Sequence, residues 1–316
     1  MYRLRKAAKL ALAAATLGAL AQETVIRVDV NLVRVLATVK NPQGQLVGTL
    51  QKGDFEIRDN GVAQEIAVFE HHTEQPLSVE LLIDISGSTA KELKYETDSA
   101  SRFLKALLSE GNPDDAVSLW SFKYEVRKER SFTRNHASLE HALRGLKAEA
   151  GTALYDAIYL GAEELEDREG RHVMVVVTDG GDTFSRKDFR SSVEAAQMAD
   201  AVIYPVLVMP ITNDAGRNIG GENALTTMAQ WTGGRVFQPT IGPALDAAFA
   251  EIIRDLRTQY LLGFYPKNVP LTKNRFHNLE VKVRRPDLRV SARSGYYSDA
   301  EGDAAPAGWR PATRPK

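Results

Sequence analysis

Apolar segments with the character of buried strands alternate with amphipathic helical segments through the middle of this chain. Residues 172–178 are almost continuously apolar, as strands covered on both faces of a parallel sheet are, and residues 201–208 repeat that character. Residues 78–83 form an earlier strand, which is followed by an apolar helical face. This order predicts an α/β fold with a doubly wound, mostly parallel sheet and helices on both faces.

The other elements of this region follow from turn signals and periodicity. Residues 116–122 and 126–132 are predicted to form a hairpin, and residues 235–237 a short strand. Helices are predicted over residues 138–146, 153–165, 187–198, 223–231 and 244–256.

Short predicted strands lie on both sides of the α/β region. Residues 24–70 are predicted to form short strands, because residues 25–30 alternate and residues 32–39 are rich in β-branched side chains. The turn at Asp59-Asn60-Gly61 predicts a hairpin between residues 55–57 and 63–69. A second set of strands is predicted at residues 260–265, 279–284 and 288–292. We expect the strands of the two ends to pair as one small β module beside the α/β region.

The first residues have the composition of a targeting segment. Residues 1–9 are rich in basic side chains, and the apolar run 10–21 ends in Ala19-Leu20-Ala21, the small-x-small pattern of a signal-peptidase site. The run is shorter than the about 20 apolar residues of a membrane span. We therefore predict a signal peptide cleaved near Ala21, a secreted or periplasmic protein, and no membrane span after cleavage; the alternative is an uncleaved anchor.

These patterns divide the chain into five parts. They are the signal peptide (1–21), an N-terminal β segment (24–75), the α/β domain (78–257), a C-terminal β segment (258–298) and a tail (299–316) whose richness in Ala, Pro and charge predicts disorder. The formal net charge of -1 creates no field for polyanions, so we expect no nucleic-acid partner. No pattern indicates an oligomeric state.

Oxygen-bearing side chains follow the predicted strands at the edge where open α/β sheets bind ligands. Asp84, Ser86 and Ser88 come directly after the strand at 78–83, and Asp179 follows the strand at 172–178. Thr152 lies on a loop at the start of a predicted helix. The chain has no cysteine, so a metal here would rest on oxygen or histidine ligands. Two hydroxyls with a few carboxylates suit Mg²⁺, with Mn²⁺ or Ca²⁺ as possible replacements.

The segments around these residues resemble the metal-ion-dependent adhesion site (MIDAS) of the von Willebrand factor type A (VWA) family. The matching strings are Asp84-x-Ser86-x-Ser88, Thr152 within A-G-T-A-L-Y-D-A, and Asp179 within V-V-T-D-G, in the family's order and spacing. A β segment before the domain and a Y-L-L-G-F-Y-P strand after it are similar to a secreted bacterial subgroup of the family.

The resemblance implies a role for each residue. Ser86 and Ser88 would bind the ion directly, Thr152 would bind it in the partner-bound form, and Asp84 and Asp179 would hold it mainly through water. Neutral hydroxyls leave the ion short of negative charge, so it would favour a carboxylate offered by a protein partner. Function is then expected to be metal-dependent, adhesion-type protein binding.

Other interpretations remain at this stage. Ser88 and Thr152 are also typical helix N-caps. Asp182, which departs from the family pattern, is a further candidate for the metal shell, a solvated loop residue or a cap of the helix predicted from Lys187. Asp84 is a candidate nucleophile of a phosphatase-like enzyme, although Ile85-Ser86 replaces the second acid of such sites.

No enzyme signature accompanies these residues. The strings H-E-x-x-H, G-x-S-x-G, G-x-x-x-x-G-K-[ST] and G-x-G-x-x-G are absent from the sequence, so we expect no enzyme. The alternative to metal-dependent binding is a structural or assembly protein of the cell envelope, in which the terminal β segments dock onto other proteins and the metal only stabilises the fold.

Overall fold

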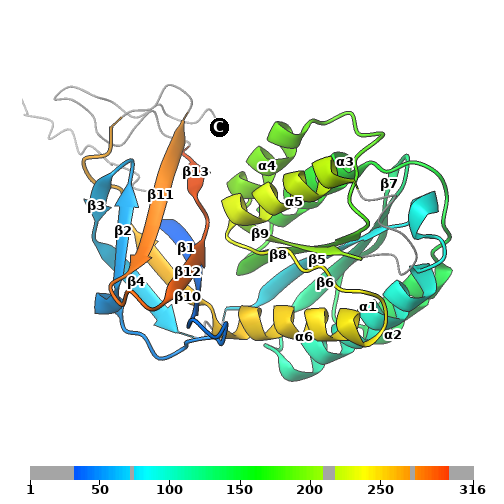
Figure 1. Cartoon of the computed structure of the whole chain (residues 1–316), viewed down its shortest axis with the longest axis horizontal. Helices are drawn as coiled ribbons and strands as arrows, with labels where there is room; N and C mark the ends of the chain where they lie inside the picture. Colours follow the sequence, from blue (N-terminus) through cyan, green and yellow to red (C-terminus); the bar gives the residue numbers. More distant parts are fainter. Residues whose placement is uncertain (1–31, 72–74, 209–217, 271–274, 299–316) are drawn as a thin grey trace, which may run out of the picture.

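The computed structural model describes residues 32–71, 75–208, 218–270 and 275–298. The predicted signal peptide, a predicted strand at residues 25–30 and the C-terminal tail lie outside the described residues. The described chain forms an α/β domain and a sandwich of two β-sheets, which lie side by side in Figure 1.

The α/β domain is built on a five-stranded sheet in the order β7-β6-β5-β8-β9. Four strands are parallel: β5 (Leu77–Asp84), β6 (Ala116–Phe122), β8 (Arg171–Thr178) and β9 (Ala201–Leu207). The edge strand β7 (Val126–Thr133) is antiparallel to β6 because a tight turn joins the two. The predicted doubly wound, mostly parallel sheet is confirmed.

Within the described residues, six helices cover the two faces of this sheet (Figure 1). One face packs against α1 (Leu93–Glu110), α2 (His136–Gly145) and α6 (Pro243–Thr258). The opposite face packs against α3 (Leu154–Glu166), α4 (Phe189–Met198) and α5 (Ile219–Thr232). Because successive side chains of a strand point to opposite faces, Leu81 joins the first core and Leu82 the second.

Strands from both ends of the chain build the β-sandwich. One sheet has the order β12-β1-β10-β4 and the other β13-β11-β2-β3. The bounds are β1 (Val33–Lys40), β2 (Phe55–Asp59), β3 (Val62–Gln64), β4 (Ile66–His71), β10 (Tyr260–Phe264), β11 (Phe276–Val283), β12 (Arg289–Ala292) and β13 (Gly295–Tyr297). N-terminal β1 pairs with C-terminal β10, and β2 pairs with β11, so the expected pairing of the two ends is confirmed.

Three local predictions are wrong. The segment 63–69 does not continue one hairpin, because the chain leaves β3 at Gln64 and enters the other sheet as β4 at Ile66. Residues 235–237 form only a single bridge, between Phe237 and Val206. Helix α5 begins at Ile219, before the predicted start, because the side chain of Asn218 accepts a hydrogen bond from Gly221 N and caps the helix there.

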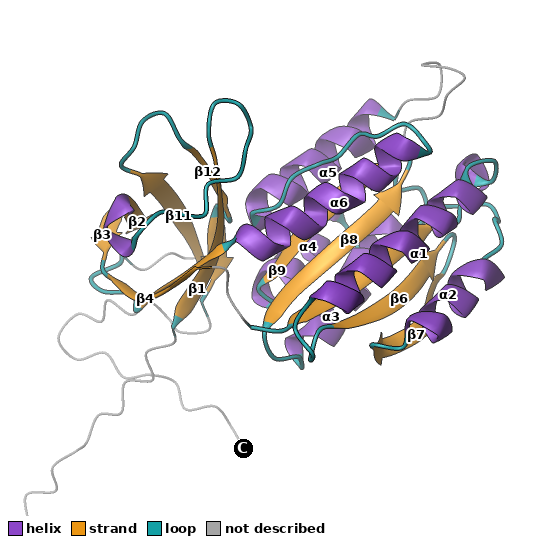
Figure 2. Ribbon diagram, turned by 90° about the horizontal axis from the view of Figure 1, so that it is seen from below, coloured by secondary structure: helices purple, strands orange, loops and turns teal. Residues whose placement is uncertain are grey.

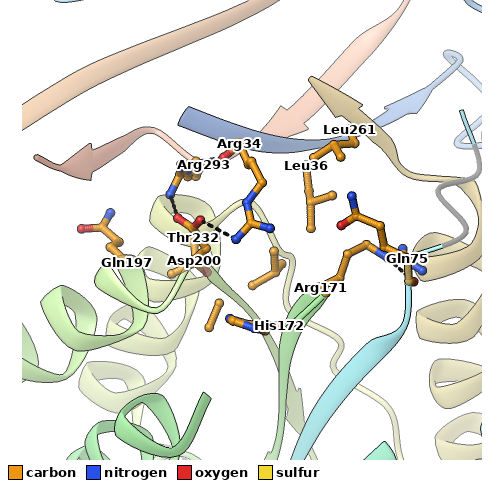
Figure 3. A pocket seen from close by; sticks show the side chains of 13 residues that line it. Arg34, Leu36, Gln75, Arg171, His172, Gln197, Asp200, Thr232, Leu261 and Arg293 are labelled. Atoms are coloured by element: carbon orange, nitrogen blue, oxygen red, sulfur yellow. Dashed lines mark hydrogen bonds and ion pairs between the residues drawn. The ribbon is translucent and has the colours of Figure 1, made fainter. Parts of the chain in front are cut away.

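The sandwich meets the α/β domain at the amino ends of the parallel strands (Figure 3). Asp200, in the turn before β9, pairs at 2.6 Å with Arg293, which directly follows β12, and at 3.5 Å with Arg34 of β1. The cavity between them is about 30 Å³, roughly the room of one water molecule. The carboxyl ends of the strands point away from the sandwich (Figure 2), so the sandwich does not cover that edge of the sheet.

Candidate metal centre

Asp84 is the last residue of β5 and is completely buried. One carboxylate oxygen accepts a hydrogen bond from Ser86 N at 2.8 Å, and the other accepts one from the Thr178 hydroxyl of β8 at 2.6 Å. The end of β5 is thereby fixed to the end of β8. These bonds hold the carboxylate in one orientation at the carboxyl edge of the sheet.

The hydroxyls of Ser86 and Ser88 lie 2.9 Å apart, directly after Asp84. Ser86 is buried and Ser88 is exposed, so the pair leads from the buried carboxylate to solvent. The loop between them turns into a short 3₁₀ helix (Gly87–Thr89), and the Thr89 hydroxyl donates to Asp84 O at 3.1 Å. The local backbone therefore presents both hydroxyls at one place.

Backbone hydrogen bonds bring the Thr152 loop to the same edge. Glu149 N donates to Ile85 O at 2.9 Å, which ties this loop to the segment that carries the serines. Thr152 N donates to the Thr183 hydroxyl at 3.0 Å, and Thr183 N donates back to Thr152 O at 2.8 Å. The loop after β8 is tied in as well, so the three segments predicted to converge do converge.

Asp179 follows β8 directly and is half-buried. Its negative charge helps to raise the pKa of both Asp84 and Glu96, so its carboxylate lies near both groups. Burial is the main cause that raises the pKa of Asp84 to about 6, while the hydrogen bonds from Thr178 and Ser86 oppose the shift.

Glu96 of α1 is a carboxyl group of this region that sequence reasoning missed. The side chain is 1% exposed, and one of its oxygens has no hydrogen-bond partner among the described residues. Burial raises its pKa well above the ordinary value, and repulsion from Asp84 and Asp179 adds to the shift. The available signal was a charged residue on the apolar face of α1, next to Leu93 and Ala100 in helical spacing.

The residues at this edge fit a hard divalent cation. Within the described segments, no three His, Cys, Asp or Glu side chains cluster as a metal site, so an ion here would rest on hydroxyls as well as carboxylates. The donors present are the adjacent hydroxyls of Ser86 and Ser88, with Thr152, Asp84 and Asp179 around them. An all-oxygen set of this kind is suited to Mg²⁺, and a cation would offset the crowded buried negative charge.

The helix-capping interpretation is wrong for both hydroxyl residues. The N-cap of α1 is Glu92 and that of α3 is Ala153, and neither N-cap residue makes a capping hydrogen bond with its own side chain. Ser88 instead faces Ser86, and Thr152 lies before the cap position.

The Asp182 carboxylate links the loop after β8 to the start of α3. Its carboxylate accepts hydrogen bonds from Tyr155 N, in the first turn of α3, and from the Ser185 hydroxyl. Asp182 therefore caps α3 from a neighbouring loop. It does not cap the helix that follows it, as one interpretation of the sequence had it, because the N-cap of α4 is Asp188.

Comparison with known proteins identifies the domain. Residues 79–181 match the family described as von Willebrand factor type A domain. An uncharacterized protein (sll0103) of Synechocystis sp. is 33% identical over 117 residues, which cover 35% of this chain and 27% of that protein. The match thus spans about a quarter of the length of this curated relative.

Solved structures with similar folds include two bacterial pilus proteins. The vWF domain of the type V pili tip protein Mfa5 from Porphyromonas gingivalis is 15% identical, with a TM-score of 0.46 over 57% of this chain and 94% of that chain. The PilB minor pilin from Streptococcus sanguinis is 14% identical, with a TM-score of 0.46 over 58% of this chain and 62% of that chain.

Proposed function

Because residues 79–181 form a von Willebrand factor type A domain, we propose that this chain is a metal-dependent protein-binding module. It holds one divalent cation, Mg²⁺ or in its place Mn²⁺ or Ca²⁺, at Asp84, Ser86, Ser88, Thr152 and Asp179. The bound ion offers a coordination position to an acidic side chain of a protein partner.

The observation that carries this proposal is a pair of adjacent hydroxyls that directly follows a buried carboxylate in the chain. The hydroxyl oxygens of Ser86 and Ser88 lie 2.9 Å apart. The Asp84 carboxylate is held in one orientation by hydrogen bonds from Ser86 N and from the Thr178 hydroxyl. Neutral hydroxyl ligands leave most of the cation's charge unneutralised. A carboxylate from outside the chain is then the group that best completes the site.

We propose a binding role rather than catalysis. Asp84, the one residue considered as a nucleophile, has no exposed surface, and both of its oxygens accept hydrogen bonds within the fold. A nucleophile has to reach its substrate. We further propose that the protein works outside the cytoplasm, on the basis of the targeting pattern in residues 1–21. Among the described residues, no helix has the length and apolar character needed to cross a membrane.

Titration calorimetry with MgCl₂ tests the metal site. We expect a saturable heat with the purified chain and none with Ser86→Ala. The matched control is Asp98→Asn, which removes an exposed carboxylate that pairs with Lys94 on α1 and should leave the heat unchanged. Equal heats from the parent chain and Ser86→Ala would end the proposal.

The structural alternative is tested by separating metal from binding. In the proposed function, a chelator abolishes capture of acidic peptides while the chain stays folded by circular dichroism. In the alternative, the chelator lowers the unfolding temperature and leaves capture unchanged, because docking would then use the β-sandwich.

A further inference from the structure

Two large aromatic side chains stand exposed at the edge of the sheet that carries the candidate metal centre. Tyr124, in the turn between β6 and β7, is 47% exposed, and Phe184, in the loop after β8, is 60% exposed. We call this pair the aromatic ledge. Exposed aromatic rings are expected at binding surfaces, because water contact with such rings is unfavourable.

The ledge lies directly beside Thr152. A Cβ atom placed on Gly151 would be 2.9 Å from Tyr124 Cβ and 3.0 Å from Phe184 Cδ2, so the two side chains flank this glycine. Phe184 N donates a hydrogen bond to Thr152 O at 3.0 Å. The aromatic ledge is therefore adjacent to Thr152, because both of its side chains flank Gly151 and the Phe184 backbone bonds to Thr152.

The ledge is held in place before any partner arrives. Ala153 N donates to Lys123 O at 2.6 Å, and the Lys123 ammonium pairs with Glu149 at 2.7 Å. The same ammonium lies 4.8 Å from the centre of the Tyr124 ring. These contacts join the turn that carries Tyr124 to the loop that carries Thr152. Little conformational entropy should therefore be lost when a partner covers the rings.

One exposed basic side chain beside the ledge complements an acidic partner segment. Arg186 is exposed two residues after Phe184, and its guanidinium forms no ion pair with the described residues. Its backbone N–H is held by the carboxylate of Asp156 at 3.1 Å, which fixes the chain at this point. A positive side chain next to an apolar surface complements a peptide that is both acidic and apolar.

We infer that the partner carries a large apolar side chain next to the acidic residue that reaches the metal, and that Tyr124 and Phe184 bind this apolar side chain. This inference rests on the proposed function, since it assigns the neighbour of the metal-bound acid. The occupant is an acidic segment of a protein in which Phe, Tyr, Trp, Leu or Met lies within two residues of Asp or Glu.

A random heptapeptide library displayed on phage and selected on the full chain with Mg²⁺ tests the inference. We expect selected peptides to contain Asp or Glu with a large apolar residue within two positions. On Phe184→Ser the apolar preference should fall by about tenfold while the acidic requirement remains, as for the loss of one interface anchor. Tyr265→Ser, which changes an exposed aromatic residue that follows β10 of the sandwich, is the matched control and should keep the preference.

The outcomes separate the two proposals. Acidic peptides selected without an apolar preference, or a preference unchanged in Phe184→Ser, overturn the aromatic ledge and leave the metal-dependent function standing. A chain that binds Mg²⁺ by calorimetry and enriches no peptide overturns the ledge as well. If the chain gives no heat with Mg²⁺, the proposed metal-dependent function itself is wrong.

Discussion

Thr178 at the end of β8 donates a 2.6 Å hydrogen bond to the buried carboxylate of Asp84 at the end of β5. The two strands are neighbours in the parallel sheet, and this bond links them at the edge where the candidate ligands converge. Asp84 therefore depends on a residue that is not itself a predicted ligand. Residues that orient metal ligands in this way are costly to replace.

Replacing Thr178 with Val should weaken Mg²⁺ binding by about tenfold, because the Asp84 carboxylate loses the donor that orients it. The free energy of unfolding should also fall by about 1–2 kcal/mol, since a buried acceptor is left with one bond fewer. Calorimetry and thermal unfolding measure the two effects. Thr227→Val, on the exposed side of α5, is the control and should change neither.

Glu80 gives the domain a pH-dependent stability. This residue lies in the middle of β5 with no exposed surface, and burial, with repulsion from Glu164, raises its pKa from 4.5 to about 8. Between pH 4.5 and about 8, Glu80 keeps a proton in the folded chain that it has released in the unfolded chain. The stabilisation is thus complete below pH 4.5 and is lost as the pH rises through about 8.

Glu80→Gln should remove this dependence. We expect the variant to match the parent chain near pH 5 and to be more stable at pH 8, by on the order of a few kcal/mol. Denaturant unfolding across this range gives the difference curve. Glu163→Gln, at an exposed position of α3, serves as the control. A flat difference curve for Glu80→Gln would show that burial of Glu80 has no energetic effect.

Gly151 is required for two separate reasons, which can be measured apart. Its φ of 87° lies in the left-handed region, and a Cβ there would meet Tyr124 at 2.9 Å. Gly44 has a similar φ of 77° with nothing near its Cβ position. Gly151→Ala should therefore cost more stability than Gly44→Ala, which we expect to cost about 1 kcal/mol. Only Gly151→Ala should also weaken Mg²⁺ binding, since Thr152 follows it; equal effects of the two changes would contradict this.

Arg293 should stabilise the junction between the β-sandwich and the α/β domain without affecting metal binding. It donates to Asp200 at 2.6 Å and also to the backbone oxygen of Arg34, so it links both parts of the chain. Arg293→Gln should lower the free energy of unfolding by about 2 kcal/mol and speed amide exchange in β12 and β13. Arg289→Gln, exposed at the start of the preceding strand β12, is the control. A loss of Mg²⁺ affinity in Arg293→Gln would show that the two edges of the sheet are coupled.

The sequence was sufficient for the α/β fold and for the loops that carry the candidate ligands. Buried parallel strands leave a clear apolar signature, and residues that directly follow them must reach the same edge, as Asp84 and Asp179 do. The five ligand assignments themselves came from the family resemblance and stay predictions.

What the sequence did not indicate depends on contacts between distant residues. Alternation in the segment 63–69 predicted strands but could not show that β3 and β4 pair in different sheets. The role of Thr178 was hidden because it is the last residue of a buried strand. Glu96 stands out on the apolar face of α1, but that position alone does not show which groups lie beside it. Both became visible only once the positions of their side chains relative to Asp84 were known.

The most direct test of the metal centre is anomalous diffraction from crystals of the chain grown with MnCl₂. We predict one strong peak about 2.0–2.6 Å from the hydroxyl oxygens of both Ser86 and Ser88, the range expected for oxygen ligands of hard divalent cations. A peak at another place on the chain, or none at this edge while Ser86 and Ser88 are ordered, would contradict the account.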